Sequence, residues 1–191
     1  MKMTTLASAA LVLIAPFAMA ETSTWKADSA HSEVDFSIKH LAISNVHGRF
    51  GKVEATITWD SSDVTKSTVN AIIDVTGVNT GVSGRDNDLK SSGYFDCDKY
   101  ATATFASTGV VKTGSGLDVT GNLTLHGVTK PVVLHVDGPT APVTGMDKKQ
   151  HVGFEATTTI KRTDFDIAPK APEAILSDEV KLTIELDAAK Q

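Results

Sequence analysis

Cysteine is almost absent from the sequence: Cys97 is the only one among 191 residues. A single cysteine excludes an internal disulfide framework, and it excludes a zinc or iron–sulfur site built from several cysteines of one chain. Cys97 lies between Asp96 and Asp98, and adjacent negative charges disfavour the thiolate, which is the reactive form of the side chain. We therefore expect a buried structural thiol. The alternatives are a catalytic nucleophile and a thiol that pairs between chains.

Positive charge is also scarce. The chain has 18 Lys and Arg against 23 Asp and Glu, which gives a formal net charge of −5. Because nucleic acid is bound by basic surfaces, we do not expect it as a partner. The sequence contains no nucleophile elbow, and its Gly81–Gly84 segment lacks the residues of a phosphate-binding loop. The motifs therefore predict a protein that is not an enzyme.

Long apolar runs are missing beyond the N-terminus. Residues 1–20 combine Lys2, an apolar stretch from Leu6 to Phe17, and the small-residue cleavage site Ala18-Met19-Ala20. This order is typical of a secretory signal peptide, and the apolar stretch is shorter than the ~20 residues that a spanning helix needs. We expect cleavage after Ala20, no stable membrane anchor, and one domain over residues 21–191. A retained anchor is the alternative.

Apolar and polar residues alternate through most of the remaining chain. Successive side chains of a strand point to opposite faces, so alternation predicts strands with one buried face. The segments with this pattern are 34–39, 53–59, 69–75, 103–107, 117–125, 132–136, 152–156 and 180–186. Turn-forming residues separate them, which favours an antiparallel barrel or sandwich. The alternation changes register between Phe50 and Val53, which predicts a bulge near Gly51.

Two segments do not alternate. Residues 84–92 predict one or two helical turns or an ordered loop, and residues 168–177, with Pro169 and Pro172, predict a long connection before the last strand. Long loops in compact domains are often functional, but here we expect a plain surface loop.

Histidine and arginine supply the remaining candidates for chemistry. The histidines, whose spacing matches no metal-ligand motif, are His31, His40, His47, His126, His135 and His151. We therefore expect no metal site. His40 shares the inward register of its strand. Arg162 also keeps an inward register, which predicts either an ion pair with an acid such as Asp164 or Asp86, or a guanidinium that is available to a ligand head group.

A set of short motifs, found in order from residue 25 to the last strand, resembles the YceI-like family. The motif residues are Trp25, Asp28, His31, Ser32, Val34, Phe36, His40, Gly48, Arg49, Phe50, Arg85, Asp86, 89–91, 94–96, Phe105, 121–130, Gly153, Phe154, Arg162 and Phe165. The resemblance implies a lipocalin-like, antiparallel eight-stranded barrel with a short helical segment around residues 84–92. It also implies a periplasmic protein that binds a polyisoprenoid, quinone-like or other long-chain lipid in an apolar cavity. No cofactor other than such a lipid is expected. A homodimer and a membrane cytochrome partner are further expectations from the resemblance.

The inward registers mix small residues with phenylalanines, which leaves room for a ligand and supplies contact area; the alternative is that small residues only fit the taper of a barrel. The residues that we expect to bind the ligand are Phe36, Ile38, His40, Phe50, Ala55, Ile57, Ala71, Ile73, Leu89, Phe95, Phe105, Leu123, Phe154, Ala156 and Arg162.

The sequence leaves two other functions open. Six histidines in an exported chain are compatible with a metal-dependent or redox-active periplasmic enzyme. A protein–protein interaction module is the second alternative.

Overall fold

The computed structural model describes residues 22–191, so the predicted signal peptide lies outside the described residues. Strands dominate this part of the chain, which holds one α-helix and two 3₁₀ helices. The strands are β1 (Thr22–Ala27), β2 (Glu33–His40), β3 (Ser44–Arg49), β4 (Val53–Asp60), β5 (Thr68–Asp74), β6 (Thr102–Lys112), β7 (Leu117–Leu125), β8 (Val128–Asp137), β9 (Val143–Thr144), β10 (Gln150–Lys161) and β11 (Leu176–Lys190). The helices are η1 (Val64–Lys66), α1 (Ser83–Lys90) and η2 (Arg162–Phe165).

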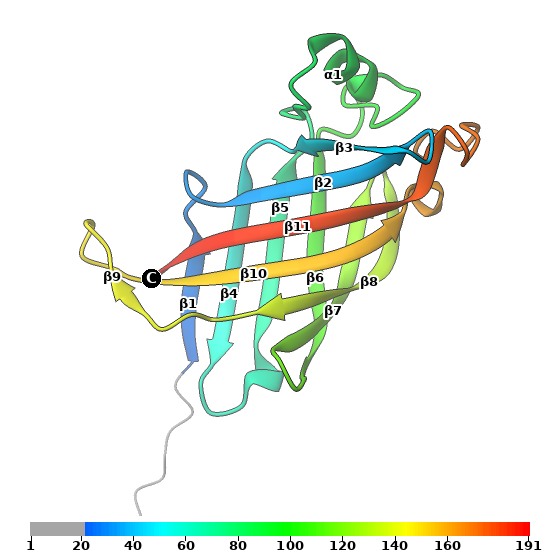
Figure 1. Ribbon diagram of the computed structural model, residues 1–191. Helices are drawn as coiled ribbons and strands as arrows, with labels where there is room; N and C mark the ends of the chain where they lie inside the picture. The colour runs from blue at the N-terminus through cyan, green and yellow to red at the C-terminus, as the bar shows by residue number, and fades with distance from the viewer. Residues whose placement is uncertain (1–21) are drawn as a thin grey trace, which may run out of the picture.

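Eight antiparallel strands close into a barrel in the order β11-β1-β4-β5-β6-β7-β8-β10, and β10 pairs back onto β11. The β2–β3 hairpin extends the wall, because β2 pairs with β11 on the same edge as β1 but further toward the start of β11. In Figure 1, β4 to β7 stand behind the long strands β2, β11 and β10. The predicted eight-stranded barrel with a short helix is therefore confirmed.

All eight alternating segments form strands, and the register of each is set by its apolar face. β1, β3 and β9 were not predicted, because they bury little: β1 buries only Trp25, and no residue of β3 or β9 is buried. The predicted bulge near Gly51 is confirmed just before β4. The Gly51 amide donates to the Asp74 carbonyl at 2.8 Å and the Asp74 amide donates to the Lys52 carbonyl at 2.9 Å, so two residues lie opposite one residue of β5.

The helical prediction is confirmed by α1, which buries none of its residues. This helix lies outside one end of the barrel (Figure 1). In the described part of the chain, residues 22–191, no helix has the length and apolar character to cross a membrane.

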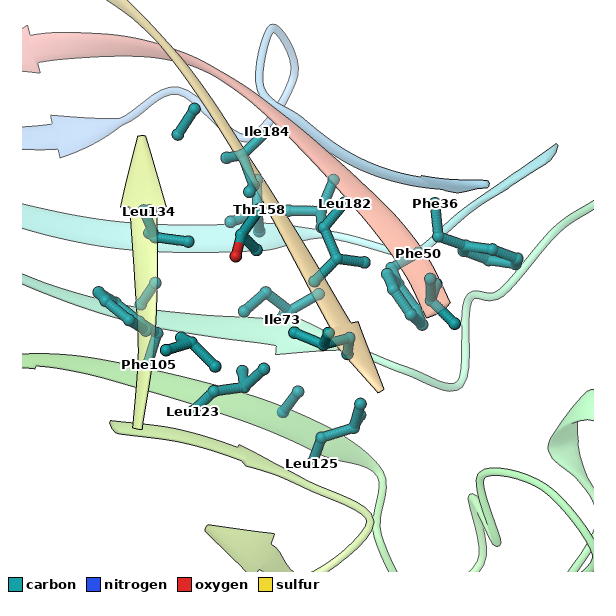
Figure 2. Close-up of a pocket in the computed structure, with 18 of the residues that line it drawn as sticks. Phe36, Phe50, Ile73, Phe105, Leu123, Leu125, Leu134, Thr158, Leu182 and Ile184 are labelled. Carbon is teal, nitrogen blue, oxygen red and sulfur yellow. The ribbon is translucent and has the colours of Figure 1, made fainter. Parts of the chain in front are cut away.

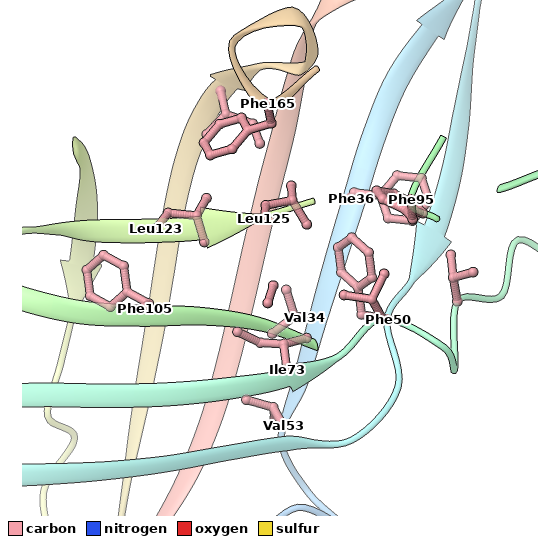
Figure 3. Packing of buried hydrophobic residues seen from close by; sticks show 14 of the residues in the cluster. Val34, Phe36, Phe50, Val53, Ile73, Phe95, Phe105, Leu123, Leu125 and Phe165 are labelled. Atoms are coloured by element: carbon pink, nitrogen blue, oxygen red, sulfur yellow. The ribbon is translucent and has the colours of Figure 1, made fainter. Parts of the chain in front are cut away.

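Aromatic rings fill the end of the barrel that lies nearest to α1. The ring of Phe50 lies 5.3 Å from that of Phe36 and 5.5 Å from that of Phe95, and Figure 3 shows the three side chains grouped together. Such tilted and edge-on pairs are favoured by the ring quadrupoles. Cys97 belongs to the same hydrophobic core. Burial raises the pKa of its thiol, which agrees with the expected structural role.

Gly121 shows that a small inward residue does not always leave space for a ligand. A Cβ atom at Gly121 would lie 2.3 Å from Cζ of Phe105 and 2.7 Å from the carbonyl oxygen of Ala106. The space beside the glycine is therefore already filled by a phenylalanine ring, as expected for a barrel wall that alternates large and small residues.

Gly121→Ala should destabilise the protein by about 1–3 kcal/mol, because the new methyl group overpacks the Phe105 ring and a neighbouring carbonyl. Urea denaturation followed by tryptophan fluorescence measures this change. Gly109→Ala is the matched control, since Gly109 lies on β6 with open space around it. Equal free energies of unfolding for the two variants would contradict the packing argument.

Candidate ligand-binding cavity

The barrel encloses an apolar cavity with a volume of about 530 Å³. This volume falls within the range of small-molecule sites, about 300–1,000 Å³. Figure 2 shows side chains from several strands converging on it, among them Ile73, Leu123, Leu182 and Ile184. Within the described residues, the charged or ionisable side chains in its wall are those of His40, Arg85, Asp88, Tyr94 and Arg162.

Period-two alternation explains how the strands supply this wall. On β7, Leu117, Val119, Leu123 and Leu125 are buried and line the cavity, while the residues between them are less buried. The pleat of a strand turns alternate side chains to the same face, so one apolar register gives a continuous apolar stripe.

The structure places most of the predicted ligand-binding residues on the cavity wall. Those that line it are Phe36, Ile38, His40, Phe50, Ile57, Ala71, Ile73, Leu89, Phe95, Phe105, Leu123, Phe154, Ala156 and Arg162. Ala55 does not line the cavity, although it is buried and lies on β4 between the lining residues Val53 and Ile57. Its methyl group is too short to extend past these larger neighbours. Contact of the wall residues with a ligand stays a prediction.

The predicted set omitted a large part of the wall. Missing from it are the inward residues of β8 and β11, which are Val132, Leu134, Val136, Val180, Leu182, Ile184 and Leu186. These positions are half-buried because they face the cavity space. Their alternation was visible in the sequence, and the same rule that selected Phe36 and Ile73 would have selected them.

Polar groups from α1 reach the cavity at its Phe36 end. The Arg85 guanidinium donates from Nε to Oγ1 of Thr80 at 2.7 Å and from Nη2 to the Thr80 carbonyl at 3.1 Å. The Asp86 carboxylate accepts from the amide and the hydroxyl of the same threonine, and this hydroxyl hydrogen bond holds the pKa of Asp86 below its usual value. Thr80 therefore fixes the position of Arg85 beside the cavity.

Some residues of the cavity wall also reach the protein surface. Among its lining residues, His40, Thr68 and Asp88 are exposed. His40 lies opposite Leu176 in the register of β2 with β11, and Leu176 is also a lining residue. The predicted inward position of His40 thus places it at an opening, which we call the β2–β11 mouth.

A family model for the YceI-like domain matches residues 25–188. The chain belongs to the YceI family. Protein YceI of Escherichia coli is 37% identical over 187 residues, which cover 96% of this chain and 94% of the relative. The YceI protein of Campylobacter jejuni has a similar structure, with a TM-score of 0.71, 35% identity, and coverage of 81% of this chain and 90% of that one.

A more distant neighbour shares the fold alone. It is a polyisoprenoid binding domain from Saccharophagus degradans, with a TM-score of 0.63 and 18% identity over 90% of this chain and 100% of that domain.

Arg162 of this YceI-family barrel forms neither of the contacts predicted for it. Its guanidinium is 3% exposed and makes no ion pair with Asp164 or Asp86. Instead, its five N–H groups donate to backbone carbonyls, which belong to Ser177, Ile167, Ala168, Ala171 and Leu176. All of its donors are thereby used, so Arg162 holds the 166–177 loop against the barrel rather than a ligand head group.

Three histidine–aspartate contacts lie near the far end of β11, and one of them, His151–Asp187, joins β10 to β11. His151 places Nδ1 2.6 Å from a carboxylate oxygen of Asp187 and Nε2 3.1 Å from one of Asp147. His31 places Nδ1 2.8 Å from a carboxylate oxygen of Asp28. Asp28, His31 and Asp187 also offer ligand atoms within 4.8 Å of one another, a juxtaposition that the sequence spacing did not predict.

The same contacts shift the ionisation of the cluster. Hydrogen bonds to Asp187 and Asp147 raise the pKa of His151, and the hydrogen bond to Asp28 raises that of His31. The His31 contact lowers the pKa of Asp28, while the Lys149 amide and then His151 lower that of Asp147. These contacts therefore favour the charged forms of His151, His31, Asp28 and Asp147 over their neutral forms.

Loss of the guanidinium at Arg162 should destabilise the protein strongly. Arg162→Lys keeps the charge but supplies three donors from a single atom, and buried carbonyls left without partners should cost about 3 kcal/mol of unfolding free energy. Chemical denaturation measures this cost. Arg49→Lys is the control, because Arg49 makes ion pairs with Glu33 and Asp35 at an exposed site, where such pairs contribute about 1 kcal/mol or less. An unchanged free energy of unfolding in Arg162→Lys would contradict the role that we assign to these hydrogen bonds.

The free energy of unfolding should fall as pH rises from about 6 to about 8. His151 and His31 have raised pKa values in the folded state, so their contribution is complete below the unfolded histidine pKa and is lost as pH rises through the folded values. His151→Gln should flatten this dependence, measured as urea midpoints over a pH series. Parallel curves for the variant and the wild type would show that His151 is not responsible.

Proposed function

We propose that the protein is an exported lipid-binding protein, which holds an isoprenoid or quinone-like amphiphile in its barrel for transport, storage or sequestration. The observation that carries this proposal is the apolar cavity of about 530 Å³, whose wall is contributed by every strand of the closed barrel except β1. The polyisoprenoid binding domain of Saccharophagus degradans, which has the same fold, supports an isoprenoid as the ligand.

The energetics favour a chain-like ligand. Burying about 300 Å² of apolar tail contributes about 7 kcal/mol at about 25 cal/mol/Å², before the cost of association is subtracted. The interior of the wall is mainly apolar, with Thr158 as a buried polar residue and the donors of Arg162 already used by carbonyls. Nearer the surface, His40, Arg85 and Asp88 offer polar partners. An amphiphile with a long apolar tail and a small polar head matches this distribution.

A binding role fits the cavity better than catalysis does. The ionisable wall residues do not converge: Arg85 is held by Thr80, Arg162 is enclosed by carbonyls, and His40 lies at the β2–β11 mouth. Nucleophile–base pairs of the kind that catalysis requires are not formed among them.

The proposed site of action is the periplasm, after removal of residues 1–20 as a signal peptide. The order of charged, apolar and small residues at the N-terminus supports this part of the proposal. The homodimer and the membrane cytochrome partner stay predictions that rest on the family resemblance.

Organic extracts of the purified protein should contain a long-chain lipid, detectable by mass spectrometry, and lipid-free protein should take up added polyprenol or ubiquinone. Trp59 lines the cavity, so its fluorescence reports uptake. Ala71→Phe should lower ligand affinity at least about tenfold, because the ring occupies cavity space. Ile72→Phe is the matched control, since Ile72 lies next to Ala71 on β5 and faces outward.

Two results would refute the proposal. One is native protein without bound lipid that also fails to take up either compound. The other is equal affinity of the Ala71→Phe and Ile72→Phe variants, both folded, which would place the ligand outside the barrel.

A further inference from the structure

Large apolar side chains are exposed at the β2–β11 mouth. The turn between β2 and β3 carries Leu41, Ala42 and Ile43, and the loop before β11 carries Ile175. Leu41 is 48% exposed, Ile43 81% and Ile175 48%. We call these four residues the apolar tip. In Figure 1 the turn and the loop lie beside each other at the right-hand end of the barrel.

The turn that carries Leu41 and Ala42 has a strained backbone. Leu41 has φ = 52° and Ala42 has φ = 57°, and the Ile43 amide donates to the His40 carbonyl at 3.2 Å. Two central residues with positive φ are found in type I′ turns, which strongly favour Asn-Gly. A leucine and an alanine in these positions reduce stability, and an exposed leucine gains nothing from burial. Strain of this kind marks positions that are kept for a function.

The tip is held in place by the barrel. The Leu41 amide donates to the Ile175 carbonyl at 2.8 Å, which joins the turn to the loop, and the Ile175 amide donates to the Pro172 carbonyl at 2.9 Å. Arg162 fixes the same loop through the carbonyls of Ala171 and Leu176. The apolar side chains are therefore presented on a preformed surface.

The tip is continuous with the cavity. His40 immediately precedes Leu41, and Leu176 immediately follows Ile175; both line the cavity and they are paired in the sheet. A ligand that leaves the cavity at this mouth would thus meet the apolar tip before it meets water.

The tip lacks the acidic excess of the whole chain. Residues 39–47 and the 166–177 loop contain Lys39, Lys170, Asp166 and Glu173, which gives +2 − 2 = 0, whereas the chain carries −5. Neither lysine forms an ion pair with a described residue. Exposed aliphatic side chains flanked by two lysines without ion pairs complement an anionic lipid surface, from which the acidic remainder of the chain is repelled.

We propose that the apolar tip docks the barrel on an anionic lipid bilayer, so that the ligand passes between membrane and cavity through the β2–β11 mouth. This inference rests on the proposed lipid-binding function and adds the surface from which the lipid is taken or to which it is delivered.

The test compares transfer from vesicles with direct uptake. Vesicles of phosphatidylethanolamine and phosphatidylglycerol carry a fluorescent polyprenol, and the rate of its transfer to lipid-free protein is measured together with co-sedimentation. Ile43→Asp should slow transfer and weaken co-sedimentation by about tenfold or more. The double variant Leu41→Asn, Ala42→Gly should also slow transfer, yet unfold at a higher denaturant concentration, because it relieves the strained turn.

Val111→Asp is the matched control, since Val111 is 60% exposed on β6 and lies outside the tip. It should transfer lipid at the wild-type rate. Uptake of the same polyprenol added from ethanol should be unchanged in all variants. Wild-type transfer rates in both tip variants would overturn the inference. It would also be overturned if the tip only joined two copies of the chain, in which case Ile43→Asp would abolish a dimer and leave the transfer rate unaltered. If the wild type takes up no polyprenol by either route, the proposed function fails, and co-sedimentation alone decides whether the tip binds membranes.

Discussion

The pairing of β10 with β11 is the constraint on which the barrel depends. Its register runs without interruption from His151 opposite Ala189 to Lys161 opposite Glu179. On its other edge β11 pairs with β2 and then with β1, so this one strand joins the first strands of the chain to the last. By contrast, β8 and β10 share only the register from Glu155–Asp137 to Thr157–His135. Closure through β11 creates an interior. The apolar faces of the other strands are buried because they face this interior.

The barrel interior contains both densely packed side chains and an unfilled cavity. Protein cores are normally packed as densely as organic crystals, and each unfilled volume costs contacts. Here the ends of the barrel are packed in the ordinary way, by the Phe36, Phe50 and Phe95 rings at one end and by the contact of Trp59 with Phe154, at 6.3 Å between ring centroids, further along. The aliphatic side chains between them surround the cavity. The cavity wall therefore combines packed aromatic pairs with aliphatic side chains that face open space.

The alternation of apolar and polar residues predicted those strands that bury one face. Alternation identified β4, β5 and β7 and led to part of the cavity wall, because a strand with one buried face carries an apolar side chain at every second residue. It could not identify β3, whose side chains are not buried and whose position is fixed by pairing with β2. It selected Ala55 by register, but register says nothing of side-chain length beside Val53 and Ile57. The carbonyls around Arg162 belong to a loop that has no periodic sequence pattern, so alternation could not predict these contacts. The sequence spacing of Asp28, His31 and Asp187 likewise does not show that they lie together in the fold.

The five backbone carbonyls that enclose Arg162 hold the loop at the β2–β11 mouth over a wide range of pH and salt. An arginine stays protonated throughout the physiological range, and backbone carbonyls do not titrate. The enclosed contacts are also shielded from the dissolved ions that screen exposed ion pairs. A rise in pH and added salt therefore weaken the His151 contacts at the other end of β11, but leave the anchoring of the 166–177 loop untouched. The β2–β11 mouth would thus keep its shape while a change of pH or salt altered the electrostatics of the exposed surface.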